Sequence, residues 1–180
     1  MSLTKEQERK IAGTLKDLFG YNNPMQLPKI EKVVVSVGTG RFNKDKVRNK
    51  LVEERLAKIT GQKSAPRGAK KSIASFKTRQ GDIIGYQVTL RGKRMYDFID
   101  RLLHTALPRT RDFRGLKRES VDEMGNCTIG IKEHTIFPEN ADEDLKDIFS
   151  FAITIVTSAS TKKEALAFLE HLGFPFKKVK

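Results

Sequence analysis

Hydrophobic residues recur at helical spacing in four segments of the chain. This spacing predicts amphipathic helices, each with an apolar side that faces a core. Two segments begin with the pattern of a capping box, Thr4 with Gln7 and Thr161 with Glu164, which satisfies free backbone N–H groups of the first turn. The predicted helices run from Lys5 to Phe19, from about Val47 to Gly61, from about Met95 to Pro108, and from Thr161 to Gly173.

Alternation of apolar and polar residues predicts the strands. Val33, Val35 and Val37 predict one strand, and two shorter runs predict strands near 128–132 and 151–157. In a further strand one face is apolar and the other is too polar for a core; the apolar face is Ile84, Tyr86, Val88 and Leu90, and the polar face is Gly85, Gln87, Thr89 and Arg91. The sequence therefore predicts an α+β protein with helices on one face of a sheet and the other face left to a partner.

Glycine and basic residues dominate the segment between Gly61 and Gly85. It contains six Lys or Arg side chains and only scattered apolar residues, so it predicts an extended loop or hairpin arm. We expect this loop to be disordered in the free protein. With 180 residues and no internal repeat, the chain suits a single domain, 1–180, with the loop at about 64–84.

The net charge of +13 is unevenly distributed. Residues 1–60 carry a net charge of +6, residues 61–118 carry +11 and residues 119–180 carry −4. A positive surplus in the middle attracts polyanions, so a nucleic acid is the favoured partner. An anionic membrane is a weaker alternative, because the basic residues do not form one side of an amphipathic helix and no apolar stretch approaches the roughly 20 residues needed to cross a bilayer. The polar N-terminus and the single cysteine predict a cytoplasmic location.

Residues that could carry catalysis or bind a metal form no recognised pattern. The turn Gly38-Thr39-Gly40 follows a strand, as in a dinucleotide-binding motif, but the third glycine of that motif is absent. His104, His134 and His171 are far apart in the sequence, and Cys127 is expected to be a half-buried structural residue. We therefore predict no enzymatic activity, no cofactor and no metal site.

Basic side chains surround an aromatic ring in two places. Around Phe76 they can neutralise phosphates while the ring stacks on a base, a combination suited to irregular RNA. The alternative is that Phe76 anchors the loop in the core. A third basic group begins the helix before Met95, where positive charge is unfavourable against the helix dipole and indicates an external anion. The groups are Lys70, Lys71, Lys77 and Arg79 around Phe76; Arg109, Arg111 and Arg114 around Phe113; and Arg91, Lys93 and Arg94.

Several long segments resemble the bacterial ribosomal protein L five family, whose members bind 5S ribosomal RNA. The resemblance covers nearly the whole chain and is carried by MQLPKIEKVVVSVGTG, ITGQK, IASFKTRQGDIIGYQVTLRGKRMYDFIDRL, ALPRTRDFRGL, IGIKEHTIFPE and GFPFKK. It implies an α+β fold with helices on one face of an antiparallel-rich sheet whose other face meets RNA. It also implies a non-catalytic role in the central protuberance of the large subunit, where the protein holds 5S rRNA against 23S rRNA and neighbouring ribosomal proteins.

The resemblance also implies three groups of contact residues. The 5S rRNA contact would use Ser36, Gln62, Lys63, Thr89 and Arg91. The loop that reaches the transfer RNA in the peptidyl site would use Lys70, Lys71, Phe76, Lys77, Arg79 and Gln80. An intersubunit bridge to a basic protein in the head of the small subunit would use Arg109, Arg111, Arg114, Asp142, Glu143 and Asp144.

Three residues depart from the family pattern. Ser36 stands in place of asparagine, Gly68 in place of a basic residue and Cys127 in place of tyrosine, so each could weaken a single contact. Two other functions remain as alternatives. An RNA-modifying enzyme would need a convergent set of titratable groups, and a free RNA chaperone would bind many RNAs with similar affinity.

Overall fold

The structure is a computed structural model that describes residues 2–40, 45–140 and 148–177. Five strands in the described ranges form one sheet in the order β2-β3-β1-β5-β4. The strands are β1 (Ile30–Gly38), β2 (Ala65–Gly68), β3 (Ile83–Leu90), β4 (Cys127–Ile131) and β5 (Phe151–Thr157). The main helices are α1 (Leu3–Phe19), α2 (Lys46–Thr60), α3 (Gly92–Arg101) and α5 (Lys162–His171). The predicted α+β class is confirmed.

The chain divides into two compact units. Unit 1 contains Met1–Val33, Arg91–Ile129 and Thr154–Lys180, and unit 2 contains Val34–Leu90 and Gly130–Ile153. Each unit therefore has its own part of the core. Whether they unfold together as the single domain expected from the sequence stays a prediction.

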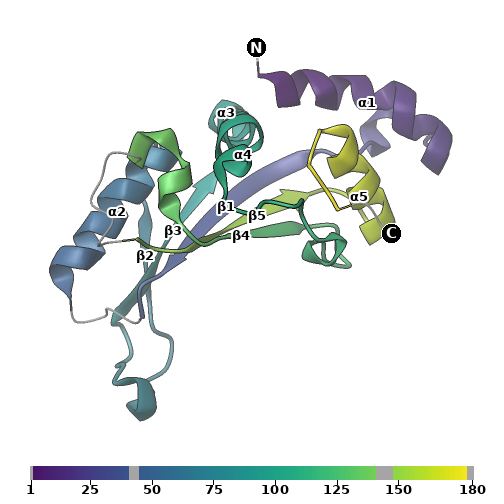
Figure 1. The fold of residues 1–180 in the computed structure, drawn as a ribbon. Coiled ribbons are helices and arrows are strands. Elements are labelled where there is room, and N and C mark those ends of the chain that lie inside the picture. The colour runs from purple at the N-terminus through teal and green to yellow at the C-terminus, as the bar shows by residue number, and fades with distance from the viewer. Residues whose placement is uncertain (1, 41–44, 141–147, 178–180) are drawn as a thin grey trace. The chain divides into compact units, whose positions relative to one another are not determined.

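In unit 2, α2 covers the apolar face of the strands. As the alternation predicts, Val35 and Val37 of β1 and Tyr86, Val88 and Leu90 of β3 are buried there, and so are Val52, Leu56 and Ile59 of α2. Against the prediction, Ile84 is only half-buried and Gly85 is buried. The helix begins after Asp45, whose side chain accepts from the Arg48 N–H, and ends at Gly61 in the left-handed conformation. The predicted end of this helix is confirmed. Figure 1 shows α2 beside β2 and β3, with the hairpin between these strands extending beyond them.

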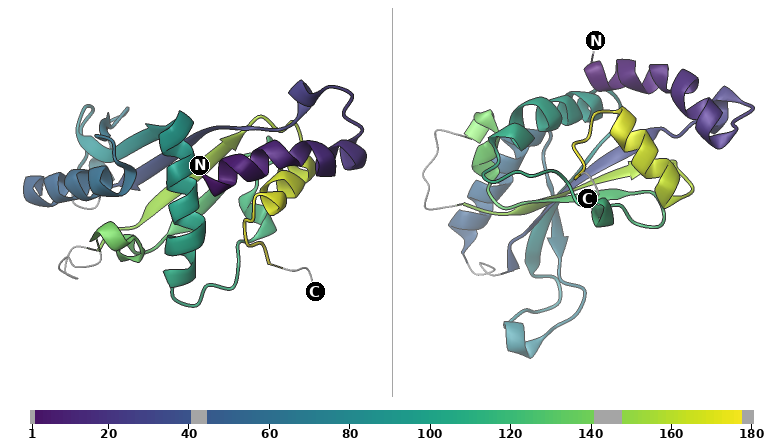
Figure 2. Two further views of the ribbon diagram at one scale, coloured as in Figure 1. Left: turned by 90° about the horizontal axis from the view of Figure 1, so that it is seen from above. Right: turned by 45° about the vertical axis from the view of Figure 1, so that its right-hand side comes forward.

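In unit 1, α1 packs against α3 and α5 (Figure 2). The predicted capping box at Thr4 is wrong, because Thr4 lies inside the helix and is fully buried. The cap comes from α3, where the Asp100 carboxylate accepts from the backbone N–H groups of Leu3 and Thr4, both at 3.0 Å, and from the Thr4 hydroxyl. A carboxylate distant in sequence thus replaces a local cap and brings α1 to α3.

Two tyrosine–glutamate pairs also hold α1 in place. The Tyr96 hydroxyl donates to Glu8 of α1, and the Tyr21 hydroxyl donates to Glu164 of α5. Burial, together with the neighbouring carboxylate, raises the pKa of each tyrosine. The second predicted capping box is confirmed in one of its two bonds, because the Thr161 side chain accepts from the Glu164 N–H at the start of α5. The Glu164 carboxylate accepts from the N–H of Ser160 instead of that of Thr161.

The helix that was expected to stop at Pro108 continues past it to Arg109. A π-helical turn, Leu102–Ala106, follows α3 and leads into the short α4 (Leu107–Arg109), which contains Pro108. In the π turn the Leu107 N–H bonds to the carbonyl of Leu102, five residues back. The wider π register changes which carbonyls the following residues face, so proline, which has no N–H to donate, is tolerated within the last turn.

Candidate RNA-binding surface

One face of the unit 2 strands is not covered by α2. The side chains of Val34, Ser36, Gln87 and Thr89 are half-buried, whereas their neighbours along each strand are buried. β2 pairs with β3 in antiparallel register, Ala65 opposite Gln87 and Arg67 opposite Gly85, so Ala65 and Arg67 share this face. We call these six residues the open face. As predicted from the sequence, Gln87 and Thr89 lie on the opposite face of β3 from its buried side chains; Val34 and Ala65 are the apolar members of the open face.

The structure brings together two of the predicted 5S rRNA residues. The side-chain amide of Gln62 donates to the backbone carbonyl of Thr89 at 3.2 Å, although 27 positions separate them in the sequence. Gln62 directly follows the helix-ending Gly61, and its backbone N–H bonds to the Thr60 hydroxyl, which itself donates to the Leu56 carbonyl at 2.7 Å. The end of α2 therefore fixes the position of Gln62.

The other three predicted 5S rRNA residues have different settings. Ser36 lies on the open face, and Lys63 is exposed, next to Gln62 in the segment that leads into β2. Arg91 belongs to unit 1, where it is exposed and occupies the residue before α3 without capping it. The exposed basic start of α3, with Lys93 and Arg94, agrees with the expectation from the sequence.

Sequence reasoning missed an ordered polar pair on the open face. The Arg67 Nε donates to the Gln87 side-chain oxygen at 2.6 Å. All four residues of β2 are exposed, so this strand carries no burial pattern that a sequence could reveal. A charged guanidinium held by a neutral amide keeps its charge available to a phosphate. Arg67 therefore supplies positive charge next to Gly68.

The predicted basic loop is a hairpin tip, which we call the finger (69–82). Its base continues the strand pairing, since Ala69 N–H donates to Asp82 and Gly81 N–H donates to Ala69. Nearer the tip, Ile73 and Thr78 exchange backbone hydrogen bonds, and Ser72 accepts from the Gln80 N–H. A 3₁₀ turn, Ala74–Phe76, closes the tip. Backbone hydrogen bonds therefore define its conformation with little burial of side chains.

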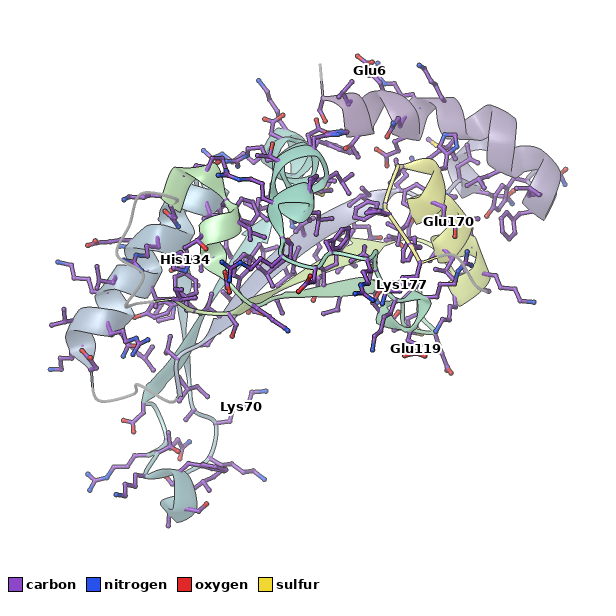
Figure 3. The ribbon with its side chains drawn as sticks, in the orientation of Figure 1. Glu6, Lys70, Glu119, His134, Glu170 and Lys177 are labelled. Carbon is purple, nitrogen blue, oxygen red and sulfur yellow. The ribbon has the colours of Figure 1, made fainter. Side chains whose placement is uncertain are left out.

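The aromatic and basic side chains of the finger are exposed to a partner. Phe76 is 74% exposed, so the alternative that it anchors the loop in the core is wrong. Lys70, Lys71, Lys77 and Arg79 are all exposed, and the Lys70 side chain projects from the hairpin (Figure 3). Asp82 is the one acidic residue in the finger, and its carboxylate accepts from the Arg79 backbone N–H at 2.8 Å. The net charge of the finger is therefore +3.

The predicted basic group around Phe113 lies in unit 1. Arg109, Arg111 and Arg114 lie at the surface around the half-buried Phe113. Two backbone hydrogen bonds, Leu116 N–H to Pro175 and Lys177 N–H to Leu116, fix the end of this loop against the C-terminal segment. The acidic residues predicted to join it in the bridge, Asp142, Glu143 and Asp144, lie outside the described residues.

His134 and Cys127 are buried, and their neighbours indicate structural roles for both. His134 stacks on Phe149 with ring centroids 4.3 Å apart, and its Nε2 lies 3.4 Å from Arg55 of α2. Burial raises the pKa of Cys127 to about 11, so its thiol is neutral at physiological pH. It is fully buried rather than half-buried as expected. In the parts of the chain that the structure describes, no three His, Cys, Asp or Glu side chains are grouped as a metal site would need, and no helix has the length and apolarity to span a membrane.

An uncovered polar sheet face together with a basic, aromatic finger is typical of a nucleic-acid-binding protein. Known families agree with this interpretation. Residues 23–79 match the family described as "Ribosomal protein L5", and residues 83–176 match the C-terminus of the same ribosomal family. The chain is 48% identical over 176 residues to "Large ribosomal subunit protein uL5" of Flavobacterium johnsoniae, covering 98% of this chain and 96% of the relative.

Two further relatives with the same name match over similar lengths. The protein of Desulfotalea psychrophila is 49% identical, covering 99% of this chain and all of the relative, and that of Geobacter sulfurreducens is 50% identical, covering 94% of each. The chain therefore belongs to the ribosomal protein L5 family. It is a structural constituent of the large ribosomal subunit, in a family that is not enzymatic.

Proposed function

We propose that this protein binds 5S rRNA through the open face and anchors it to 23S rRNA and the neighbouring proteins of the central protuberance. The observation that carries this proposal is the hydrogen bond between Gln62 and Thr89. It uses the amide N–H of Gln62 and leaves the amide oxygen as an acceptor, which suits a 2′-hydroxyl or an exocyclic amine of RNA. Lys63 follows Gln62 and Arg91 follows β3 in the sequence, and both are exposed, so in this proposal each neutralises a phosphate of the RNA.

The finger has a separate role in this proposal, contact with the transfer RNA in the peptidyl site. The composition and exposure of the tip support this role, since the tip presents the exposed side chains of Phe76, Lys77, Arg79 and Gln80. The hairpin extends beyond β2 and β3 (Figure 1), so within unit 2 its tip is separate from the strands that form the open face.

The basic loop of unit 1 would form the intersubunit bridge. Arg109, Arg111 and Arg114 lie at the surface, and arginine offers paired donors to carboxylates and phosphates alike. The acidic segment with Asp142, Glu143 and Asp144 would dock the basic protein of the small-subunit head through charge complementarity.

A filter-binding assay with paired variants tests this division of roles. Lys77→Ala/Arg79→Ala should leave 5S rRNA affinity within about twofold of wild type, because the finger serves the transfer RNA. Lys63→Ala/Arg91→Ala removes the same amount of charge beside Gln62 and at the end of β3, and should weaken 5S binding by about tenfold or more. Equal losses from the two double variants would contradict separate roles for the sheet and the finger.

A further inference from the structure

Two of the most exposed apolar side chains in the described residues lie on turns of unit 1. Met25 is 76% exposed and Met124 is 73% exposed. Neither residue belongs to the open face, the finger or the basic loop around Phe113, so no role described above uses them. Methionine is flexible and polarisable, and it adapts to a partner surface more readily than other apolar residues do.

Both turns are attached to one short segment, residues 157–159. The chain before β1 is held there by Lys29, whose backbone N–H donates to the Ser158 hydroxyl and whose carbonyl accepts from the Ser158 N–H, both at 2.9 Å. The chain before β4 is held there by the Thr157 hydroxyl, which donates to the Gly125 carbonyl at 2.7 Å. The turns that carry the two methionines therefore flank the same segment.

Local hydrogen bonds fix each turn before any partner arrives. The Met25 N–H donates to the Asn23 side-chain oxygen at 2.9 Å. In the turn of Met124, the Asp122 carboxylate accepts from the Asn126 backbone N–H at 2.6 Å and from its side-chain amide at 3.1 Å. A surface whose backbone is already ordered loses less conformational entropy on association.

Opposite charges lie next to the two methionines. Lys29 is exposed, and its ammonium group lies 3.9 Å from the Met25 sulfur. Glu123 is exposed and precedes Met124 in the sequence. Neither charge forms a salt bridge with the other or with another of the described residues. We call Met25, Lys29, Glu123 and Met124 the methionine surface, which has a basic side and an acidic side.

A surface with this arrangement of charge is complementary to a second copy of itself. In a dimer with two-fold symmetry, a contact between two different residues occurs twice, once in each direction. Lys29 of each copy then faces Glu123 of the other copy, and the methionines of both copies are covered between these pairs. RNA fits the same surface poorly, because Glu123 repels a phosphate backbone.

We propose that the protein, when it is free of RNA, associates with a second copy through the methionine surface as a two-fold dimer. The contact is small, so the dissociation constant should be about 100 µM. The methionine surface shares no residue with the open face or the finger. Loss of 5S rRNA binding and loss of dimerisation are therefore independent outcomes.

Sedimentation equilibrium of the RNA-free protein at about 150 mM salt, from about 5 to 300 µM protein, tests the proposal. The average mass should rise from that of the 20.4 kDa chain towards that of two copies and no further. Met25→Ala/Met124→Ala should weaken association by about tenfold. Val47→Ala truncates another side chain that is 73% exposed, but in unit 2, and should change nothing.

Two outcomes of this experiment would overturn the proposal. A wild-type mass that stays at 20.4 kDa over the whole range would leave the methionine surface to a different protein. A mass that grows beyond two copies would show an open, head-to-tail contact in place of a closed two-fold one.

Charge reversal provides a second readout. Lys29→Glu alone and Glu123→Lys alone should each place like charges opposite each other and weaken association by about tenfold or more. An equimolar mixture of the two variants should restore it, because every contact in the mixed dimer again pairs opposite charges. Lys10→Glu and Glu133→Lys, at exposed positions elsewhere, are the matched controls and should associate as wild type does. A mixture that stays monomeric, or a single reversal that associates at wild-type strength, would overturn the proposal.

Discussion

The side-chain amide of Gln62 donates to the backbone carbonyl of Thr89 across 3.2 Å. This bond joins the second residue after the end of α2 to the penultimate residue of β3. One of the two N–H groups of the amide is used in this bond, so the bond fixes the direction in which the amide oxygen points as an acceptor. The open face thereby has an acceptor of defined position at its edge, next in the sequence to the charge of Lys63.

Substitutions at Gln62 should separate its structural from its binding contribution. Gln62→Ala should lower the free energy of unfolding by about 1 kcal/mol and 5S affinity by about tenfold. Gln62→Glu should lower affinity further, because a carboxylate repels both the Thr89 carbonyl and nearby phosphates. Gln80→Ala in the finger is the control and should leave 5S affinity unchanged. Urea unfolding and filter binding measure the two effects; an unchanged 5S affinity for Gln62→Glu would contradict the assignment.

Two strand glycines should respond in opposite ways to alanine. A Cβ on Gly85 would lie 2.6 Å from the Val37 carbonyl oxygen, whereas a Cβ on Gly130 would meet nothing within 4 Å. Gly85→Ala should therefore destabilise the protein by about 1–3 kcal/mol, since backbone must move. Gly130→Ala should be neutral or stabilising by up to about 1 kcal/mol. Urea denaturation compares the variants, and similar midpoints for both would show that β1 and β3 do not approach this closely.

The attachment of α1 should depend on pH through Asp100. Burial tends to raise the pKa of this carboxyl, but hydrogen bonds from Thr4 and Leu3 outweigh burial and hold the pKa below the usual value for aspartate. A lowered folded-state pKa means that the stabilisation is complete above the unfolded pKa of about 3.9 and is lost as pH falls through the folded pKa.

Asp100→Asn tests this contribution. At pH 7 it should reduce the free energy of unfolding by about 1–2 kcal/mol, and the difference from wild type should shrink below about pH 4. Asp97→Asn, at an exposed position of the same helix, is the control and should have little effect. A difference between Asp100→Asn and wild type that stays constant from pH 7 to about pH 3 would show that ionised Asp100 does not cap α1.

Cys127 should be unreactive in the folded protein. Burial raises the pKa of its thiol to about 11, and the side chain is inaccessible. Only the thiolate reacts rapidly with disulfide reagents. Ellman's reagent should therefore titrate one thiol in urea and none within the same time in native buffer at about pH 8. Rapid labelling without denaturant would show that β4 opens readily.

The finger should exchange its amide protons faster than the strands that support it. Backbone hydrogen bonds define its tip, but Ala69 is its only buried residue. Few buried apolar contacts give a low free energy of local opening. Hydrogen exchange of the free protein should show weak protection at Ile73 and Thr78 and strong protection in β3. Equal protection in both segments would contradict the expected mobility of the free finger.

Local signals in the sequence were sufficient for much of the fold. The valines of β1 and the glycine after α2 predict a strand and a helix end because each acts through its own backbone or its immediate neighbours. The start of α1 and the helical turn at Pro108 could not be predicted in the same way. The first depends on Asp100, almost a hundred positions away, and the second on a π-helical register that places proline inside a helix.

The candidate site shows the same limit. The polar face of β3 follows from alternation, so Thr89 could be assigned to it from sequence. β2 has no buried residue, and nothing in its four residues indicates that Arg67 pairs with Gln87. The exposure of Phe76 was undecided because the same ring can anchor a loop or wait for a ligand. The 74% exposure of Phe76 in the folded chain decides against the anchor.

The most direct test of the central claim is a binding titration of the wild-type protein with 5S rRNA and with a structured control RNA of the same size, each at about 50 and 200 mM salt. Selective binding through the open face predicts that 5S affinity persists at the higher salt while control binding falls by orders of magnitude. Parallel loss of both would contradict selective 5S recognition and leave only a generic basic surface.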